Sequence, residues 1–182
     1  MIYIAAPFFN SKQLAIVEGV EKILDKLSIP YYSPRKAGVL SPDSNDADRN
    51  AVYQSNVNAL RSYATMVLAC TAFPLPDKVD LALVAKIADD DYRITPVNLP
   101  DTGTVYEIGF AVSRGIPVIG YHHCIGDHTN ESLNVMLTEA FEGFVFSRFQ
   151  LLDLLKVLYV ECAGCEVARA RGLLLKWKGQ VR

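Results

Sequence analysis

The sequence lacks a hydrophobic run long enough to cross a membrane. A membrane-spanning helix needs about 20 consecutive apolar residues, and the most apolar stretch, residues 64–73, is far shorter. The opening segment MIYIAAPFF also lacks the basic start and the long apolar centre of a secretory signal peptide. We therefore expect a soluble, cytoplasmic protein that does not associate with membranes.

Cysteine and net charge are also scarce. Four cysteines in 182 residues do not form the dense pattern of a disulfide scaffold, so we expect a reduced, intracellular protein. The formal net charge of −2 creates no overall field that would draw the chain to nucleic acid. There is no GxGxxG and no P-loop lysine motif, so the sequence indicates neither dinucleotide nor triphosphate chemistry.

A metal site is not predicted either. Cys162 and Cys165 have CxxC spacing, and His122, His123 and Cys124 lie earlier in the chain. This spacing does not match a known zinc finger, and the CxxC pair does not follow the βαβ opening of a redox domain. Two small residues at the end of a helix explain the pair better.

Short apolar runs alternate with amphipathic segments along the chain. We predict strands at residues 2–6, 31–33, 65–70, 117–121 and 143–146, and helices at residues 11–27, 47–63, 101–114, 130–141 and 149–159. Strands that alternate with helices indicate a parallel sheet. The predicted fold class is α/β: one domain over residues 1–160, with a flavodoxin-like or Rossmann-like parallel five-stranded sheet flanked by helices.

Three segments do not fit this alternation. Residues 35–48 are rich in Gly, Ser, Pro, Asn and Asp, which predicts a loop. Residues 71–100 place prolines on both sides of an acidic centre, and a connection this long is more often a functional lid than a plain link; residues 79–88 within it can form one short helix. Residues 161–182 form a basic C-terminal tail, in which a solvated cationic helix is expected, with contact to phosphate or an acidic partner as the alternative.

The segment DTGTVYEIGFA, residues 101–111, follows the long connection and begins a predicted helix. In a parallel α/β sheet, ligands bind beyond the carboxyl ends of the strands, so chemistry is expected here. Glu107 has two interpretations: it closes a capping box with Thr104, or it is a carboxylate in the first helical turn that the helix dipole keeps ionised for attack on an anomeric carbon. Asp101 either caps the helix or forms an Asx turn, or it handles a proton. Two carboxyl groups with separate roles are typical of retaining glycoside chemistry.

Three blocks of sequence resemble the nucleoside 2-deoxyribosyltransferase family. DTGTVYEIGFAVSRGIPVI is similar to the family signature, in which Asp-x-Gly precedes Glu, a hydrophobic residue and Gly-x-Ala. IYIAAPFF resembles the opening strand and loop, and SLNVM resembles an Asn-x-Met element. The blocks occur in the family's order between residues 2 and 136. The resemblance implies a pentosyltransferase, a glycosyltransferase that exchanges nucleobases between 2′-deoxynucleosides without a cofactor or a metal.

The resemblance also implies catalytic roles for three residues. Glu107 is the nucleophile that forms a deoxyribosyl–enzyme ester, with net retention at the anomeric carbon. Tyr3 hydrogen-bonds this carboxylate, although a buried core aromatic is an equally simple interpretation from the sequence. Asp101 contacts the base and helps to protonate its leaving nitrogen.

Five further residues are implied in substrate binding: Phe8, Asn56, Gly103, Asn134 and Met136. A neighbouring subunit supplies Asn134 and Met136 in the family, which implies a homo-oligomer with a shared active site; Met136 is otherwise a helix core residue. Asn56 stands where some members have Asp, and an amide can read a base edge but cannot supply a proton. Asn56 can also be an ordinary polar helix residue, and the preference between purines and pyrimidines stays open.

Two rival functions remain. Related N-glycosidases hydrolyse deoxynucleoside 5′-monophosphates and have a Ser-rich, basic first loop and a Ser in place of Asn134. The loop AAPFFNS and Asn134 favour a nucleoside, while Lys12 and Arg35 keep the nucleotide possible. A non-catalytic nucleotide-binding domain, in which Glu107 only caps a helix, is the other rival.

Overall fold

The computed structural model describes residues 1–38, 40–70, 101–122, 132–133, 135–159, 174 and 180–181. The predicted lid at 71–100 with its short helix, almost all of the basic tail, Asn134 and the CxxC pair lie outside these residues and stay predictions. None of the helices in the described ranges is long and apolar enough to cross a membrane.

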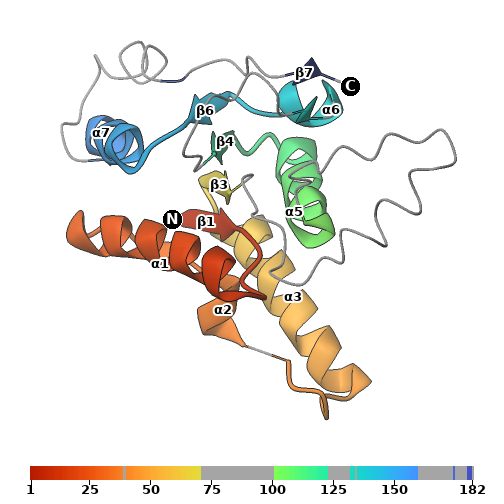
Figure 1. The fold of residues 1–182 in the computed structure, drawn as a ribbon. Coiled ribbons are helices and arrows are strands. Elements are labelled where there is room, and N and C mark those ends of the chain that lie inside the picture. Colours follow the sequence, from red (N-terminus) through yellow and green to blue (C-terminus); the bar gives the residue numbers. More distant parts are fainter. Residues whose placement is uncertain are drawn as a thin grey trace, which may run out of the picture.

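Five parallel strands form the central sheet in the order β2-β1-β3-β4-β6, which confirms the predicted fold class (Figure 1). The strands are β1 (Ile2–Ala5), β2 (Tyr31–Tyr32), β3 (Met66–Cys70), β4 (Val118–Tyr121) and β6 (Gly143–Val145). Every residue of β1, β3, β4 and β6 is buried, as expected for a sheet covered on both faces. The strand order reverses between β1 and β3, which is where such sheets bind ligands.

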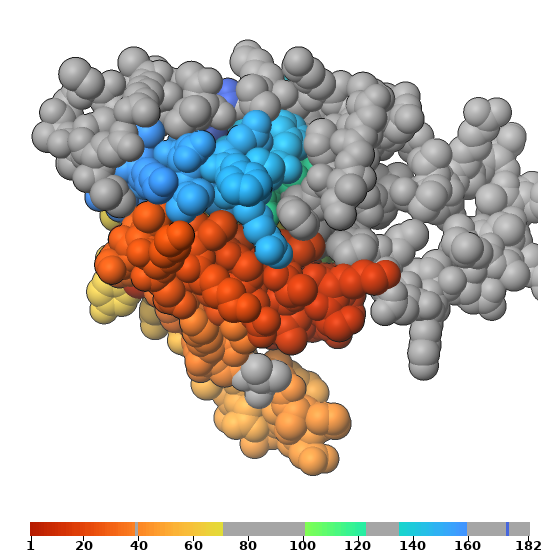
Figure 2. All heavy atoms as spheres, turned by 60° about the vertical axis from the view of Figure 1, so that its left-hand side comes forward, coloured from red at the N-terminus to blue at the C-terminus, as the bar shows by residue number. Residues whose placement is uncertain are grey.

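Two layers of helices cover the sheet. Helices α1 (Ser11–Lys26) and α7 (Arg148–Tyr159) pack on one face, and Figure 2 shows α7 lying directly against α1. Helices α3 (Asp46–Ser62) and α5 (Thr102–Ser113) pack on the other face. Because side chains alternate along a strand, Ile2 and Ile4 join the core under α1, whereas Tyr3 and Ala5 face α3 and α5.

Local sequence signals explain where the helices begin and end. The Asn10 side chain accepts a hydrogen bond from the Gln13 amide at 2.9 Å and so caps α1. Asn45 and Asp48 form a capping box at the start of α3. Gly115 follows α5 with a φ of +69°, a left-handed conformation that glycine adopts without strain.

Two predicted segments differ from the structure. The predicted loop at 35–48 includes most of the short helix α2 (Pro34–Ala37), because Pro34 is pre-organised for the first helical position. The predicted helix at 130–141 is wrong. Its residues form the strand β5 (Ser132–Leu133) and the short helix α6 (Val135–Thr138), because β5 pairs in parallel with β7 (Gln180–Val181) and is thereby held extended.

Gly120 in β4 provides a test of the sheet packing. A Cβ at this position would lie 2.2 Å from Cδ1 of the Phe144 ring on β6. Gly120→Ala should therefore lower the free energy of unfolding by about 1–3 kcal/mol, measured by urea denaturation. Gly109→Ala is the matched control: Gly109 lies in α5 with no atom within 4 Å of an added Cβ, so this change should leave stability unchanged or raise it by up to ~1 kcal/mol. Equal effects of the two changes would contradict this packing.

Candidate active site

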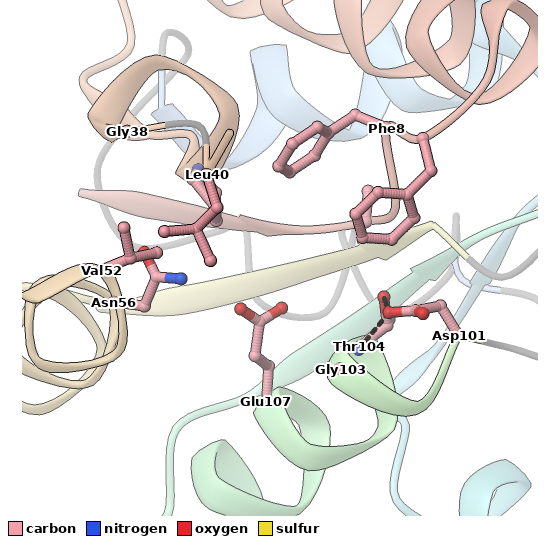
Figure 3. A pocket seen from close by; sticks show the side chains of 12 residues that line it. Phe8, Gly38, Leu40, Val52, Asn56, Asp101, Gly103, Thr104 and Glu107 are labelled. Atoms are coloured by element: carbon pink, nitrogen blue, oxygen red, sulfur yellow. Dashed lines mark hydrogen bonds between the residues drawn. The ribbon is translucent and has the colours of Figure 1, made fainter. Parts of the chain in front are cut away.

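A cavity of about 430 Å³ lies beyond the carboxyl end of β1. Its walls come from the loop after β1, from α2 and the segment that follows it, from one face of α3, and from the start of α5 (Figure 3). The lining residues are Ala6, Phe8, Phe9, Pro34, Gly38, Leu40, Val52, Asn56, Asp101, Gly103, Thr104 and Glu107. Five of the eight predicted site residues therefore line one cavity, and a sixth, Tyr3, hydrogen-bonds one of these five, Glu107.

Tyr3 and Glu107 are joined by a short hydrogen bond in which the Tyr3 hydroxyl donates to Glu107 Oε1. Tyr3 is fully buried in β1, and its position in the strand directs the ring toward α5. Tyr3 is thus a core aromatic and also a hydrogen-bond donor to the carboxylate.

Burial dominates the acid–base properties of this pair. Burial, with the neighbouring Glu107 carboxylate, raises the pKa of Tyr3 well above its ordinary value, so the hydroxyl keeps its proton. Burial also raises the pKa of Glu107; the Tyr3 hydrogen bond lowers it, the negative charge of Asp101 raises it, and the result is a pKa of about 7. The prediction that Glu107 lies in the first helical turn is wrong. Glu107 lies in the second turn of α5, beyond the first turn where the dipole acts most strongly.

The start of α5 is capped by Asp101 and not by Thr104. Asp101 Oδ2 accepts a hydrogen bond from the Thr104 amide at 3.0 Å (Figure 3), so the capping box of Thr104 and Glu107 is not formed. A Cβ at Gly103 would lie 2.9 Å from Asp101 Oδ2, which explains the need for glycine beside this carboxylate. Asp101 thus fixes the helix start while its carboxyl group faces the cavity.

Asn56 lies at the opposite end of the cavity from Asp101 (Figure 3). Its Oδ1 accepts a hydrogen bond of 3.0 Å from the hydroxyl of Tyr32, the last residue of β2. The Tyr32 ring stacks on the Tyr3 ring, with 5.4 Å between centroids and 14° between planes. Sequence reasoning missed Tyr32, although its place at the carboxyl end of the second predicted strand was a usable signal.

Comparison with known proteins identifies the family of the chain. A family model described as Nucleoside 2-deoxyribosyltransferase matches residues 2–153. The chain belongs to the nucleoside 2-deoxyribosyltransferase family. Comparison with curated protein sequences gives no significant match.

A solved 2-deoxyribosyltransferase structure shares the fold. A 2-deoxyribosyltransferase from Bacillus psychrosaccharolyticus matches with a TM-score of 0.59 and 23% identity, over 84% of this chain and 90% of that one. A conserved protein from Enterococcus faecalis V583 gives a TM-score of 0.48 with 17% identity, over 84% and 94% of the two chains. A 2-desoxiribosyltransferase from Leishmania mexicana gives 0.44 and 17%, over 71% and 66%.

Met136, in the segment that resembles the family's Asn-x-Met element, is not among the residues that line this cavity. Met136 lies in α6 with 78% of its surface exposed, so it is not a helix core residue. Asn134 lies outside the described residues. Phe8 does line the cavity, where its ring packs on Phe9 at 5.3 Å between centroids.

Arg35, one of two cations that kept a nucleotide substrate possible, is engaged elsewhere. Its guanidinium donates to both carboxylate oxygens of Glu21 in α1, and Lys36 Nζ lies 3.2 Å from the same carboxylate. Burial raises the pKa of Glu21, but the hydrogen bonds from Arg35 and Lys36 outweigh it and the pKa falls below its ordinary value. Neither Arg35 nor Lys12 lines the cavity, and its described lining contains two carboxyl groups and no cation.

The raised pKa of Glu107 makes a prediction about stability. A group whose folded-state pKa of about 7 exceeds its ordinary value of 4.5 stabilises the fold at low pH, and this contribution is lost as the pH rises through 7. Glu107→Gln removes the ionisation. The melting temperature of Glu107→Gln minus that of the parent protein should therefore be greater at pH 8 than at pH 5, by at least about 3 °C.

Differential scanning calorimetry at the two pH values measures this difference. Glu142→Gln is the control, because Glu142 is also a glutamate but is exposed to solvent. A difference as small for Glu107→Gln as for the control would show that Glu107 titrates near its ordinary pKa.

Proposed function

We propose that the chain transfers a 2-deoxyribosyl group between nucleobases through an ester on Glu107. The observation that carries this proposal is a carboxylate that receives a hydrogen bond from a buried tyrosine and lines the same cavity as a second carboxyl group. Glu107 attacks the anomeric carbon, the bond from this carbon to the base nitrogen breaks, and its electron pair leaves with the base. A carboxylate is suited to this step because the anomeric carbon becomes oxocarbenium-like.

Asp101 serves the departing base in this proposal. Its Oδ2 is occupied by the Thr104 amide, and Oδ1 has no hydrogen-bond partner within the described residues. In its protonated form, Asp101 can therefore bind the base through Oδ1 and pass its proton to the ring nitrogen, as general acid catalysis requires. An acceptor base then attacks the anomeric carbon, the ester to Glu107 breaks, and Asp101 regains the proton. Two displacements give net retention.

An uncharged nucleoside fits the cavity better than a nucleotide. A phosphate is usually bound by arginine, lysine or a helix N-terminus. The described lining contains no cation, and the start of α5 is already occupied by the Asp101 carboxylate. Both features disfavour a 5′-phosphate and support the nucleoside over the nucleotide N-glycosidase alternative.

A second copy of the chain completes the site in this proposal. Val135 and Met136 in α6 are 44% and 78% exposed and lie away from the cavity of their own chain. Apolar residues exposed together are often covered by a partner. We propose that Met136, with Asn134, reaches the cavity of a neighbouring subunit in a cytoplasmic homo-oligomer.

Covalent capture tests the proposed nucleophile. Mixing the protein with 2′-deoxyinosine and quenching with acid should give one deoxyribosyl adduct by intact mass spectrometry. Glu107→Gln should give none, because an amide does not attack, while the control Glu142→Gln should behave like the parent protein. Adding adenine should then produce 2′-deoxyadenosine; free deoxyribose as the main product would identify a hydrolase instead.

The pH dependence of adduct formation follows from the pKa of Glu107. Only the ionised carboxylate attacks, and burial raises its pKa to about 7. In Asp101→Asn, which removes the second titrating carboxyl group of the site, the single-turnover rate of adduct formation should therefore rise about tenfold for each pH unit below about 7 and level off above it. Rapid-quench measurements from pH 5 to 9 record this rate. A rate that is flat between pH 5 and 7 would mean that Glu107 is already ionised there.

A further inference from the structure

Tyr3 and Tyr32 form a pair across the first two strands. They are direct partners in the parallel register of β1 and β2, and their rings stack. Each hydroxyl reaches a different helix: Tyr3 donates to Glu107 in α5, and Tyr32 donates to Asn56 in α3. One aromatic stack therefore positions groups at two ends of the cavity.

The hydrogen bonds of Tyr32 fix the direction of the Asn56 amide. A tyrosine hydroxyl has one proton, and Tyr32 donates it to Asn56 Oδ1 at 3.0 Å. The Ser55 Oγ lies 2.8 Å from the same hydroxyl, so Ser55 is the donor in that contact. With Oδ1 held by Tyr32, the Nδ2 group of Asn56 is directed into the cavity, toward the space in front of Glu107 (Figure 3).

The residues that line the cavity beside Asn56 are apolar, so the Asn56 amide nitrogen is available to a ligand at this end. Val52 lies one helical turn before Asn56, and Leu40, Gly38 and Pro34 line the adjacent wall. None of these four side chains can accept a hydrogen bond. An amino group of a base at this position would meet the Nδ2 group of Asn56 donor against donor, whereas a carbonyl oxygen would accept a hydrogen bond directly from Nδ2. Sites built around a fixed donor reject the wrong partner more strongly than apolar sites do.

We propose that Tyr32 is a positioning residue that sets the base specificity of this site. By holding Oδ1 of Asn56, it makes the cavity select nucleobases with a carbonyl oxygen at the edge facing α3 over those with an amino group. This inference rests on the proposed function, because it takes the cavity as the nucleoside site. It makes Asn56 a hydrogen-bond donor to the base and makes Tyr32 the residue that orients the Asn56 amide.

Binding measured in a variant that cannot turn over separates this inference from catalysis. In the Glu107→Gln background, isothermal titration calorimetry compares two pairs of nucleosides that differ in carbonyl against amino: 2′-deoxyinosine with 2′-deoxyadenosine, and 2′-deoxyuridine with 2′-deoxycytidine. The carbonyl member of a bound pair should bind at least about fivefold more tightly. Adding Tyr32→Phe keeps the ring but removes the hydroxyl that holds Oδ1, so the Asn56 amide can rotate by about 180°. The preference should then fall to within about twofold.

Two further variants make the test specific. Tyr31→Phe removes a hydroxyl from the adjacent residue of β2, which contacts Lys36 and packs on the opposite side of the sheet, so it should leave the preference unchanged. Asn56→Asp places a second acceptor where Nδ2 stands, so the preference should reverse toward the amino nucleosides. This variant also tests the inference if Tyr32→Phe does not fold.

The outcomes distinguish the two proposals. An unchanged preference in Tyr32→Phe, or a parent preference for amino nucleosides, overturns the role of Tyr32 even if Glu107 forms its adduct. Carbonyl preference that collapses in Tyr32→Phe supports the inference even if no adduct forms. Failure of all four nucleosides to bind overturns both the nucleoside site and the specificity built on it.

Discussion

The hydrogen bond from Tyr3 to Glu107 is the contact on which the site depends. It joins the first strand of the sheet to the helix that begins beyond the third strand, and it holds a partly buried carboxylate in one orientation. Burial makes ionisation of this carboxylate costly and the tyrosine hydroxyl offsets part of that cost, which leaves Glu107 with a pKa of about 7. A group balanced in this way changes its charge near neutral pH, which is a common property of residues at functional sites.

The fold produces this contact through strand register and side-chain alternation. Tyr3 faces α5 because Ile2 and Ile4 are used on the α1 side of the sheet. Tyr32 lies beside Tyr3 because β2 pairs with β1 in parallel, and the two rings stack. The Glu107 and Asn56 ends of the cavity therefore depend on neighbouring positions on two strands, and a change in the register of β2 would disturb both ends together.

The features that could be predicted from the sequence are those that depend on nearby residues in the chain. Buried strands, amphipathic helices and the Asp-x-Gly…Glu motif are local features, and they predicted the sheet and brought Glu107, Asp101 and Gly103 to one cavity. Prediction from the sequence failed where long-range pairing decides. Ser132 and Leu133 fall within the segment predicted to be a helix, but pairing with β7 holds them extended. The role of Tyr32 was missed for the same reason, since it depends on which strand lies beside β1.

The most direct test of the account is the location of the covalent adduct. After acid quench of the reaction with 2′-deoxyinosine, trypsin should release residues 94–114 as one peptide that contains both carboxyl groups of the motif. Tandem mass spectrometry of that peptide should assign the deoxyribosyl mass to Glu107. Its assignment to Asp101, or base exchange with no modified peptide at all, would contradict the central role given to Glu107.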